Sequence, residues 1–292
     1  MQRRRGRGDG RGQPSADIVA DNGVIHVIDS LIRPECGTAS TRCGWGCEGD
    51  LSCLCRTVAT SRSSLPPDNR AMTELLVIRH GETDWNRQQR FQGQIDVPLN
   101  ELGLAQAGRL GRRLVDEPVD VLISSDLQRA RSTADALAQL RGLQPEIQAL
   151  WREQSFGVLE GLDLPTIRSR HADLWSAWTR HDADYALPGG GESNAAFHAR
   201  VMRALQAVLV AHAGRRVVVV THGGVLDMLW RTAHALPLHG ARACEIPNTG
   251  INRLRWVDNG LQIVQWADAD HLGGLPEQPG TRQTTANESA RA

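Results

Sequence analysis

The chain has 292 residues, of which 40% are hydrophobic, so it can bury one sizeable core or two small ones. Its 33 basic and 33 acidic residues give a formal net charge of +0, which excludes a global electrostatic attraction to nucleic acid or to an anionic membrane. No apolar run approaches the roughly 20 residues that a membrane-spanning helix needs. The basic stretch 1–13 is not followed by the apolar segment of a secretion signal, so a cytoplasmic location is expected.

The first 71 residues differ in composition from the rest of the chain. Gly, Arg, Ser and Cys dominate there, and the one mostly apolar patch, 24–32, has no partner element nearby. Residues 1–71 are therefore expected to be disordered, or to be an extension upstream of a true translation start at Met72. Five cysteines crowd this stretch without a C-x-x-C pair: Cys36, Cys43, Cys47, Cys53 and Cys55. A zinc module and a disulfide cluster stay open for them, but the favoured interpretation is that they have no bonding role.

From Met72 onward, strands and helices are predicted to alternate. Apolar runs of the buried type predict strands over 74–79, 120–124, 146–151 and 217–221, with a closing pair within 245–266 around a turn at 258–260. Helices are predicted to begin after the capping residues Asn100, Asp126 and Ser193, and near Gly224. This alternation predicts an α/β fold, a three-layer α/β/α sandwich with a mainly parallel central sheet. The domain is expected to span 72–270, and the Pro-, Gly- and Thr-rich residues 271–292 to form a disordered tail.

Two of the predicted strands are followed by the same pair of residues, a histidine and a glycine. The run 74–79 leads into His80 and the run 217–221 leads into His222. Because ligands of α/β sheets bind beyond the carboxyl ends of the strands, both imidazoles are expected in one crevice. The strand between them in sequence leads into a helix with Arg129 in its first turn, where anions are favoured.

Several motifs around these residues occur in a fixed order. They are Arg79-His80-Gly81-Glu82-Thr83-Asp84-Trp85-Asn86, then Arg90-Phe91-Gln92-Gly93, then Pro98-Leu99 and Leu102-Gly103. With these motifs the chain resembles the histidine phosphatase superfamily, also called the phosphoglycerate mutase-like family, from about Thr73 to about Val264. A lone Arg-His-Gly would be weak evidence, whereas all of these motifs in order are strong evidence. The resemblance implies the phosphoglycerate mutase-like fold.

The resemblance also implies three catalytic roles. His80 matches the nucleophile, which forms a phosphohistidine intermediate, and His222 matches the second catalytic histidine, which touches the phosphoryl group. A histidine can attack phosphorus if it is neutral and held in one tautomer. Glu153 matches the proton donor, and Glu82 and Glu160 are nearby rivals for that task. A free carboxylate is charged at neutral pH, so the role requires a site that favours its protonated form.

Other positions of the family bind the phosphate or lie beside the substrate. The phosphate-binding positions match Arg79, Asn86, Arg129 and Gly223, and the substrate-adjacent ones match Gln92 and Gly93. Arginine suits this task because its planar guanidinium group fits phosphate oxygens. The arginines replace a metal cation, and the sequence offers no plausible cluster of metal ligands, so neither a metal nor a cofactor is expected.

Phosphatases and mutases share this machinery and differ in what meets the phosphohistidine, either water or a second substrate hydroxyl. The glycolytic mutases carry a longer insertion after the acid, whereas the stretch 160–188 is short here. Their acid also follows an Asn, whereas Glu153 follows Arg152. The sequence therefore resembles the small phosphatase branch and predicts a phosphatase of a small phosphorylated metabolite, acting as a monomer or homodimer. The alternatives are a phosphoglycerate mutase and a non-catalytic binding protein on the same fold.

Overall fold

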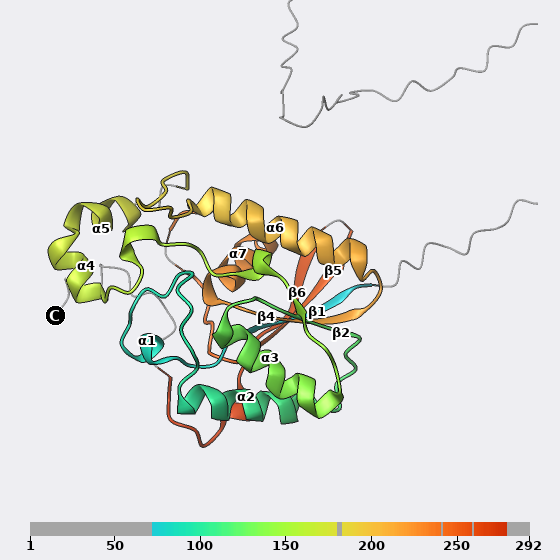
Figure 1. The fold of residues 1–292 in the computed structure, drawn as a ribbon. Coiled ribbons are helices and arrows are strands. Elements are labelled where there is room, and N and C mark those ends of the chain that lie inside the picture. Colours follow the sequence, from blue (N-terminus) through green and yellow to red (C-terminus); the bar gives the residue numbers. More distant parts are fainter. Residues whose placement is uncertain (1–71, 180–182, 241, 259, 279–292) are drawn as a thin grey trace, which may run out of the picture. The chain divides into compact units, whose positions relative to one another are not determined.

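The computed structural model describes the chain over residues 72–179, 183–240, 242–258 and 260–278. The expected N-terminal extension 1–71, with its five cysteines, and residues 279–292 of the expected tail lie outside the described residues. Within the described ranges, six strands form one central sheet, whose place between the helices can be seen in Figure 1. The order of the strands is β3-β2-β4-β1-β5-β6. The strands are β1 Glu74–Arg79, β2 Val121–Ser124, β3 Glu146–Ile147, β4 Arg216–Thr221, β5 Ile251–Val257 and β6 Gly260–Asp268.

The centre of the sheet is the parallel pair formed by β1 and β4. Their inner side chains are buried without interruption, as expected for strands that are covered on both faces. The two strands pair in register from Glu74 with Arg216 to Arg79 with Thr221. β2 and β3 continue the parallel arrangement on one side, whereas β5 and β6 add an antiparallel pair on the other. The predicted α/β class is therefore confirmed, with a mixed sheet that is parallel in four of its strands.

Helices cover both faces of the sheet, which gives the predicted three layers (Figure 1). They are α2 Glu101–Arg113 and α3 Gln128–Arg141 on one face, and α6 Asn194–Ala211 and α7 Gly223–Ala233 on the other. Successive side chains of a strand point to opposite faces, so each central strand serves both core layers. In β1, Leu76 and Ile78 pack in the core under α2 and α3, whereas Leu75 and Val77 pack in the core under α6 and α7.

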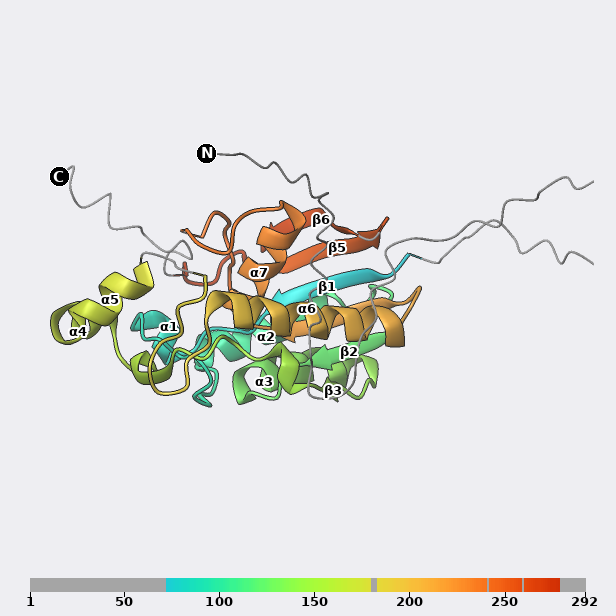
Figure 2. The ribbon, with the colours of Figure 1, turned by 90° about the horizontal axis from the view of Figure 1, so that it is seen from above.

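A group of short elements lies beyond the carboxyl ends of the parallel strands (Figure 2). The short elements of the described chain are α1 Asp84–Arg87, α4 Leu164–Arg170 and α5 Ala172–Thr179, with 3-10 helices at Ala149–Trp151, Gly157–Leu159 and Asp270–Leu272. α5 carries Trp175 and Trp178, whose ring centroids are 5.5 Å apart. Trp178 also meets Phe91 and Phe156 edge-on, with centroid distances of 5.5 and 6.4 Å. These rings pack on a small separate core that includes the buried Leu159.

Two of the expected helix caps are confirmed, and one predicted strand is shorter than expected. The side chains of Asn100 and Ser193 each accept a hydrogen bond from the backbone N–H three residues further on, at the starts of α2 and α6. The strand predicted over 146–151 ends early, because its partner strand β2 ends at Ser124, whose carbonyl accepts a last backbone bond from the N–H of Gln148 at 2.9 Å. The chain then turns into a 3-10 helix that begins at Ala149.

The cap predicted for Asp126 is wrong. α3 begins at Gln128, and the carboxylate of Asp126 instead accepts two hydrogen bonds from Arg152, at 2.7 and 2.6 Å. The start of α3 is capped instead by Asp96 from a different loop, whose carboxylate accepts the N–H of Gln128 at 2.7 Å. A bidentate pair with arginine is charge-assisted and stronger than a neutral cap, which accounts for the exchange.

The residues after β6 contact the segment that precedes β5. The side chain of Gln278 accepts the N–H of Asn248 at 2.6 Å and donates to the Asn248 carbonyl at 3.2 Å. Asn248 in turn donates from its side chain to the carbonyl of His80 at 2.9 Å. The boundaries expected for the domain and its tail stay predictions. Among the helices of the described ranges, none has the length and apolarity needed to cross a membrane.

Candidate active site

The ends of the two central strands bring the two predicted histidines together. β1 and β4 are parallel neighbours, and Arg79 pairs in register with Thr221 at their carboxyl ends. His80 and His222 follow these residues directly, and their ring centroids are 5.2 Å apart with planes inclined by 59°. The repeated strand-histidine-glycine pattern thus brings the two rings side by side, although only His80 lines the cavity described below.

The His80 ring is fixed in one orientation and one protonation state. Its Nδ1 lies 2.7 Å from the carbonyl of Gly81, so Nδ1 carries the proton and Nε2 keeps a free lone pair. The side chain is 3% exposed. Burial, together with the charges of Arg129 and Arg79, holds the pKa of His80 well below its usual 6.5, against the opposing effect of the Gly81 carbonyl. The imidazole is therefore neutral at physiological pH, as a nucleophile must be.

His222 lies next to His80 and is fully buried. Its Nε2 is 2.8 Å from the hydroxyl of Ser125, a residue that follows β2. Burial, the charge of Arg129 and the neighbouring His80 hold the pKa of His222 well below 6.5. Its Nδ1 is buried and has no hydrogen-bond partner among the described residues. A buried nitrogen without a partner is costly, so a bound group that reached it would stabilise the site.

Two arginines, the partly buried Arg79 and the buried Arg129, supply the positive charge next to His80. Arg79 donates from Nη1 to the carbonyl of Ile246 at 2.8 Å, and its buried Nε has no partner among the described residues. Burial, followed by repulsion from Arg242, lowers the pKa of Arg79 to about 10, so the group is still a cation at neutral pH. Arg129 is 1% exposed, and burial lowers its pKa to about 10. An anion between these guanidinium groups would relieve both desolvated charges.

The fork of Arg129 also shapes the loop that follows α1. Its Nη1 and Nη2 donate to the carbonyls of Ile95 and Gly93, at 2.8 and 2.7 Å. Gly93 has a φ of +51°, and a Cβ at this position would lie 2.0 Å from Oε1 of Glu160. Only glycine fits both constraints, so Gly93 and Arg129 together fix the course of the loop. Gln92, 8% exposed, lies in the same loop and lines the pocket.

Asn86 is oriented by a reciprocal cap at the start of α1. Its Oδ1 accepts the N–H of Thr83 at 3.1 Å, and the Thr83 hydroxyl accepts the N–H of Asn86 at 3.1 Å. Because the amide oxygen is engaged with Thr83, the amide nitrogen is the end of Asn86 that is left for the pocket it lines. A donor at this end suits a phosphate oxygen.

Glu153 reaches the pocket from the loop after the first 3-10 helix. Its Oε1 accepts the N–H of Gln154 at 2.8 Å and its Oε2 accepts the N–H of Gly224 at 3.0 Å. The two rivals lie elsewhere and do not line the pocket. Glu82 is bound by Arg87 and Asn100, both at 2.9 Å. The carboxylate of Glu160 accepts the N–H groups of residues 94 and 156 at 3.1 and 2.9 Å and so serves as a loop brace.

Arg200 of α6 holds the loop that carries Glu153. It pairs with both oxygens of Glu192, at 2.7 and 2.6 Å. The same guanidinium donates to three backbone carbonyls, those of Leu150, Arg152 and Glu153, at 2.9, 2.8 and 2.9 Å. A single partly buried cation thus fixes the backbone that carries the carboxylate of Glu153.

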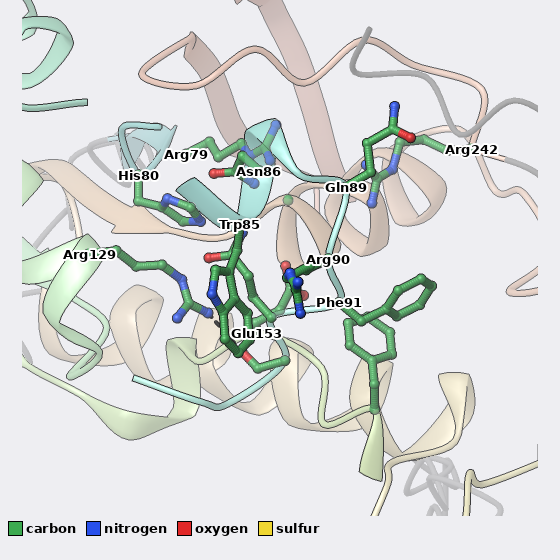
Figure 3. A pocket seen from close by; sticks show the side chains of 14 residues that line it. Arg79, His80, Trp85, Asn86, Gln89, Arg90, Phe91, Arg129, Glu153 and Arg242 are labelled. Carbon is green, nitrogen blue, oxygen red and sulfur yellow. Dashed lines mark hydrogen bonds between the residues drawn. The ribbon is translucent and has the colours of Figure 1, made fainter. Parts of the chain in front are cut away.

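These groups surround one cavity with a volume of about 210 Å³ (Figure 3). It is lined by Arg79, His80, Trp85, Asn86, Gln89, Arg90, Phe91, Gln92, Gly93, Arg129, Glu153, Phe156, Gly223 and Arg242. Of the predicted site residues, only His222 is missing from this lining, and its side chain is fully buried. Among the described residues, no group of three or more His, Cys, Asp or Glu side chains could hold a metal ion. The expectation that the site needs no metal stays a prediction.

Comparison with known proteins identifies the family. A family model described as the histidine phosphatase superfamily (branch 1) matches residues 75–269. The chain belongs to this superfamily. As a histidine phosphatase superfamily member it is an enzyme of this class, and the resemblance found in the sequence motifs is confirmed.

Similar members carry both phosphatase and mutase names. The chain is 38% identical over 203 residues to phosphoglycerate mutase-like protein 4 of Arabidopsis thaliana, a match that covers 68% of this chain and 86% of that protein. It is 37% identical over 207 residues to the metal-independent phosphoserine phosphatase of Arabidopsis thaliana, covering 70% and 85%. The structure of a mycobacterial glucosyl-3-phosphoglycerate phosphatase complexed with VO3 matches with a TM-score of 0.60 and 31% identity, covering 67% of this chain and 99% of that one.

Four residues of this histidine phosphatase site received no role from the sequence: Ser125, Arg200, Gly224 and Arg242. Ser125 and Gly224 adjoin motifs that the sequence did single out, so their positions carried a signal. Arg200 and Arg242 lie in segments without a motif, and only the fold brings them to the site.

Proposed function

We propose that this protein is a phosphatase that hydrolyses a small phosphomonoester through a phosphohistidine on His80. The observation that carries the proposal is the state of the His80 ring. Nδ1 is committed to the Gly81 carbonyl, the pKa is held well below 6.5, and Nε2 is left as a neutral nucleophile beside two cations. Such a ring suits attack on phosphorus and has no evident structural purpose.

The phosphoryl group is held between the cations and the donors that line the pocket. The guanidinium groups of Arg79 and Arg129 neutralise its oxygens, and the amide of Asn86 donates to it. His222 reaches it through the unpartnered Nδ1, and Gly223 contributes the first N–H of α7, where anions are favoured. Arg79, Arg129 and the helix terminus thus supply the charge stabilisation that a metal gives in other phosphoryl-transfer enzymes.

The reaction has two steps. In the first, Nε2 of His80 bonds to phosphorus while the ester P–O bond breaks, and the leaving oxygen takes a proton from Glu153. In the second, water attacks phosphorus and gives a proton to Glu153, while the P–N bond breaks and frees His80 and inorganic phosphate. The N–H groups of Gln154 and Gly224 donate to the two oxygens of Glu153 and so hold the carboxyl group at the pocket, where it can exchange a proton with the leaving oxygen and then with water.

Hydrolysis is favoured over mutase transfer, which is the alternative function. Transfer to a second hydroxyl requires that the phosphohistidine be shielded from water while the acceptor reorients. In its described part, the stretch between Glu160 and Pro188 contains only the short helices α4 and α5. Two of the relatives above are named phosphatases, and one is named mutase-like. The name of the metal-independent phosphoserine phosphatase also supports metal-independent action. The cytoplasmic location and the monomeric or dimeric state stay predictions.

Trapping the intermediate tests the proposal. The full-length protein is mixed with a ³²P-labelled phosphomonoester and quenched, and the label is mapped by peptide sequencing. We expect an acid-labile, base-stable adduct on His80, and neither adduct nor turnover in His80→Ala. Label on Ser124 or Ser125, or more than a few per cent of turnover in the variant, would remove His80 as the nucleophile.

A second assay separates the two functions that share this chemistry. Release of inorganic phosphate from 3-phosphoglycerate is followed beside the formation of 2-phosphoglycerate, with and without 2,3-bisphosphoglycerate. We expect phosphate release to exceed isomerisation under both conditions. Dominant isomerisation that depends on priming by the bisphosphate would replace the phosphatase assignment by the mutase.

A further inference from the structure

A third arginine faces the pocket and has no part in the phosphate site described above. Arg242 lies in the segment between α7 and β5, and its side chain is 15% exposed. Figure 3 shows it entering the cavity on the side away from His80 and Arg129, next to Gln89. Its buried Nε has no hydrogen-bond partner among the described residues. A desolvated cation that lines a cavity and lacks a full partner is suited to an anionic ligand.

The position of Arg242 is set by a buried ion pair on α7. Arg231 donates from Nε to Oδ2 of Asp227 at 3.0 Å. The other nitrogens of Arg231 hold the preceding turn by donating to the carbonyls of Pro237, His239 and Gly240, at 2.6, 2.9 and 2.9 Å. Oδ1 of Asp227 faces Nε of Arg242 across 3.9 Å, beyond hydrogen-bond distance. Asp227 therefore orients Arg242 but shares its charge with Arg231, so the charge of Arg242 is only partly compensated.

Arg242 is near the phosphate site without being inside it. A Cβ placed on Gly223 would lie 3.6 Å from Nε of Arg79 and 3.8 Å from Nη1 of Arg242, so both guanidinium groups border the same small space. Arg242 is also the charge that lowers the pKa of Arg79 most, after burial. One ligand can thus meet Arg79 with one end and Arg242 with the other. The remaining cation of the lining, Arg90, is engaged by Gln88 and by the carbonyl of Gly161 at 2.8 and 2.9 Å.

We propose that Arg242 binds a carboxylate on the leaving group, so that the preferred substrates are small phosphomonoesters with a carboxylate a few bonds from the ester oxygen. This inference rests on the proposed phosphatase function. The planar guanidinium fork matches the two oxygens of a carboxylate, and Gln89 places a neutral amide at the same end. A cavity of about 210 Å³ suits a small metabolite. The nearby carboxylates of Asp227 and Glu153 offset part of the positive charge around Arg242. The remaining charge suits one carboxylate better than a second, dianionic phosphate.

Matched substrates with and without the carboxylate test the proposal. The full-length enzyme is assayed with O-phosphoserine against O-phosphoethanolamine, and with 3-phosphoglycerate against glycerol 3-phosphate. Within each pair the phosphoester is the same and the carboxylate is absent from the second member. For each pair we take the ratio of kcat/KM for the carboxylic acid to kcat/KM for its partner without the carboxylate. In the wild type this ratio should exceed one in at least one pair. In Arg242→Gln that ratio should fall by about 10- to 100-fold, mainly through KM, as expected for the loss of a charged hydrogen bond.

Two further variants make the result specific. Arg242→Lys keeps the charge but loses the fork, and it should recover part of the ratio. Arg112→Gln removes the same charge from an exposed site on α2 and should leave the ratio unchanged. If Arg242→Gln lowers kcat/KM equally for both members of a pair, or changes neither, the carboxylate assignment is wrong. An equal loss would place Arg242 in the phosphate site instead.

A binding experiment keeps this inference separate from the proposed function. Calorimetric titration of His80→Ala with 3-phosphoglycerate and with glycerol 3-phosphate needs no turnover. We expect the acid to bind at least tenfold more tightly, and the addition of Arg242→Gln to remove that difference. Tighter binding of the acid by an enzyme that hydrolyses no phosphomonoester would refute the phosphatase and keep the carboxylate site. Hydrolysis of phosphomonoesters without tighter binding of the acid would keep the phosphatase function and refute the carboxylate site.

Discussion

Gly224 offers the sharpest test of the role given to Glu153. A Cβ at this position would lie 2.1 Å from Oε1 of Glu153, whereas ordinary contacts begin near 3.4 Å. In Gly224→Ala the carboxylate must therefore retreat by more than about 1 Å, and it loses the 3.0 Å hydrogen bond from the N–H of residue 224. A misplacement of about 1 Å costs on the order of 100-fold in rate. That factor corresponds to a barrier raised by about 2.7 kcal/mol.

The assay compares two leaving groups, because only one of them needs the acid. An alkoxide must be protonated as it leaves, whereas p-nitrophenolate is stable without a proton. In Gly224→Ala, kcat for the best alkyl phosphate should fall by roughly 100-fold, and kcat for p-nitrophenyl phosphate by less than about tenfold. The new Cβ would also lie 3.1 Å from Cε1 of the buried Phe197, so a modest fall in melting temperature should accompany the loss of activity.

The neighbouring glycine supplies the matched control. A Cβ on Gly223 would meet Arg79 and Arg242 at 3.6 to 3.8 Å, which is ordinary contact. Gly223→Ala should therefore lose less activity than Gly224→Ala, and by a similar factor for both leaving groups. If Gly224→Ala kept alkyl phosphatase activity within threefold of wild type, or lost both activities equally, the geometry would not support Glu153 as the proton donor.

Three further predictions follow from the site and from the order of the chain. Activity should survive EDTA, because Arg79 and Arg129 supply the positive charge; loss that one divalent ion restores would contradict this. The pKa of both His80 and His222 lies well below 6.5, so an unfolded chain binds more protons than the fold once the pH drops below about 6.5. The free energy of unfolding should therefore fall on acidification by up to about 1.4 kcal/mol for each histidine and each pH unit. Urea denaturation at several pH values should show a smaller dependence on pH in His80→Ala than in the wild type. An equal dependence in both proteins would refute the prediction. A chain that begins at Met72 should melt and turn over like the full chain, since β1 begins at Glu74; a clearly lower melting temperature would show that residues 1–71 stabilise the domain.

Short sequence patterns were enough to predict the two central strands and the two histidines at their ends. β1 and β4 are short runs of mostly branched apolar residues, a pattern that predicts strands buried on both faces of a sheet. Their ends carry His80 and His222, so the pairing of two parallel strands was enough to bring the rings together. The caps at Asn100 and Ser193 depend on backbone groups only three residues away. In all these cases the deciding contact is close in sequence or follows from strand pairing.

The misses have a common physical cause, because each depends on a contact between distant segments. Asp126 was the natural cap of α3, but Arg152 lies 26 positions further on and binds its carboxylate. Arg242 lines the pocket from a segment whose preceding turn is held by Arg231, a residue of α7. The sequence also could not tell which of two adjacent glycines is required by sterics, since that depends on the approach of Glu153 from another loop.

Arg129 has a second role that its sequence motif did not predict. The sequence suggests a fork that grips phosphate, yet both terminal nitrogens already donate to the carbonyls of Gly93 and Ile95. A guanidinium has five N–H donors, so each terminal nitrogen keeps one, and the unpartnered Nε keeps another. Arg129 can therefore hold the loop and still serve a phosphate, which a lysine, with one nitrogen, could not do in the same geometry. The loop carries Gln92 along the pocket wall, so the cation that attracts the substrate also shapes the cavity that receives it.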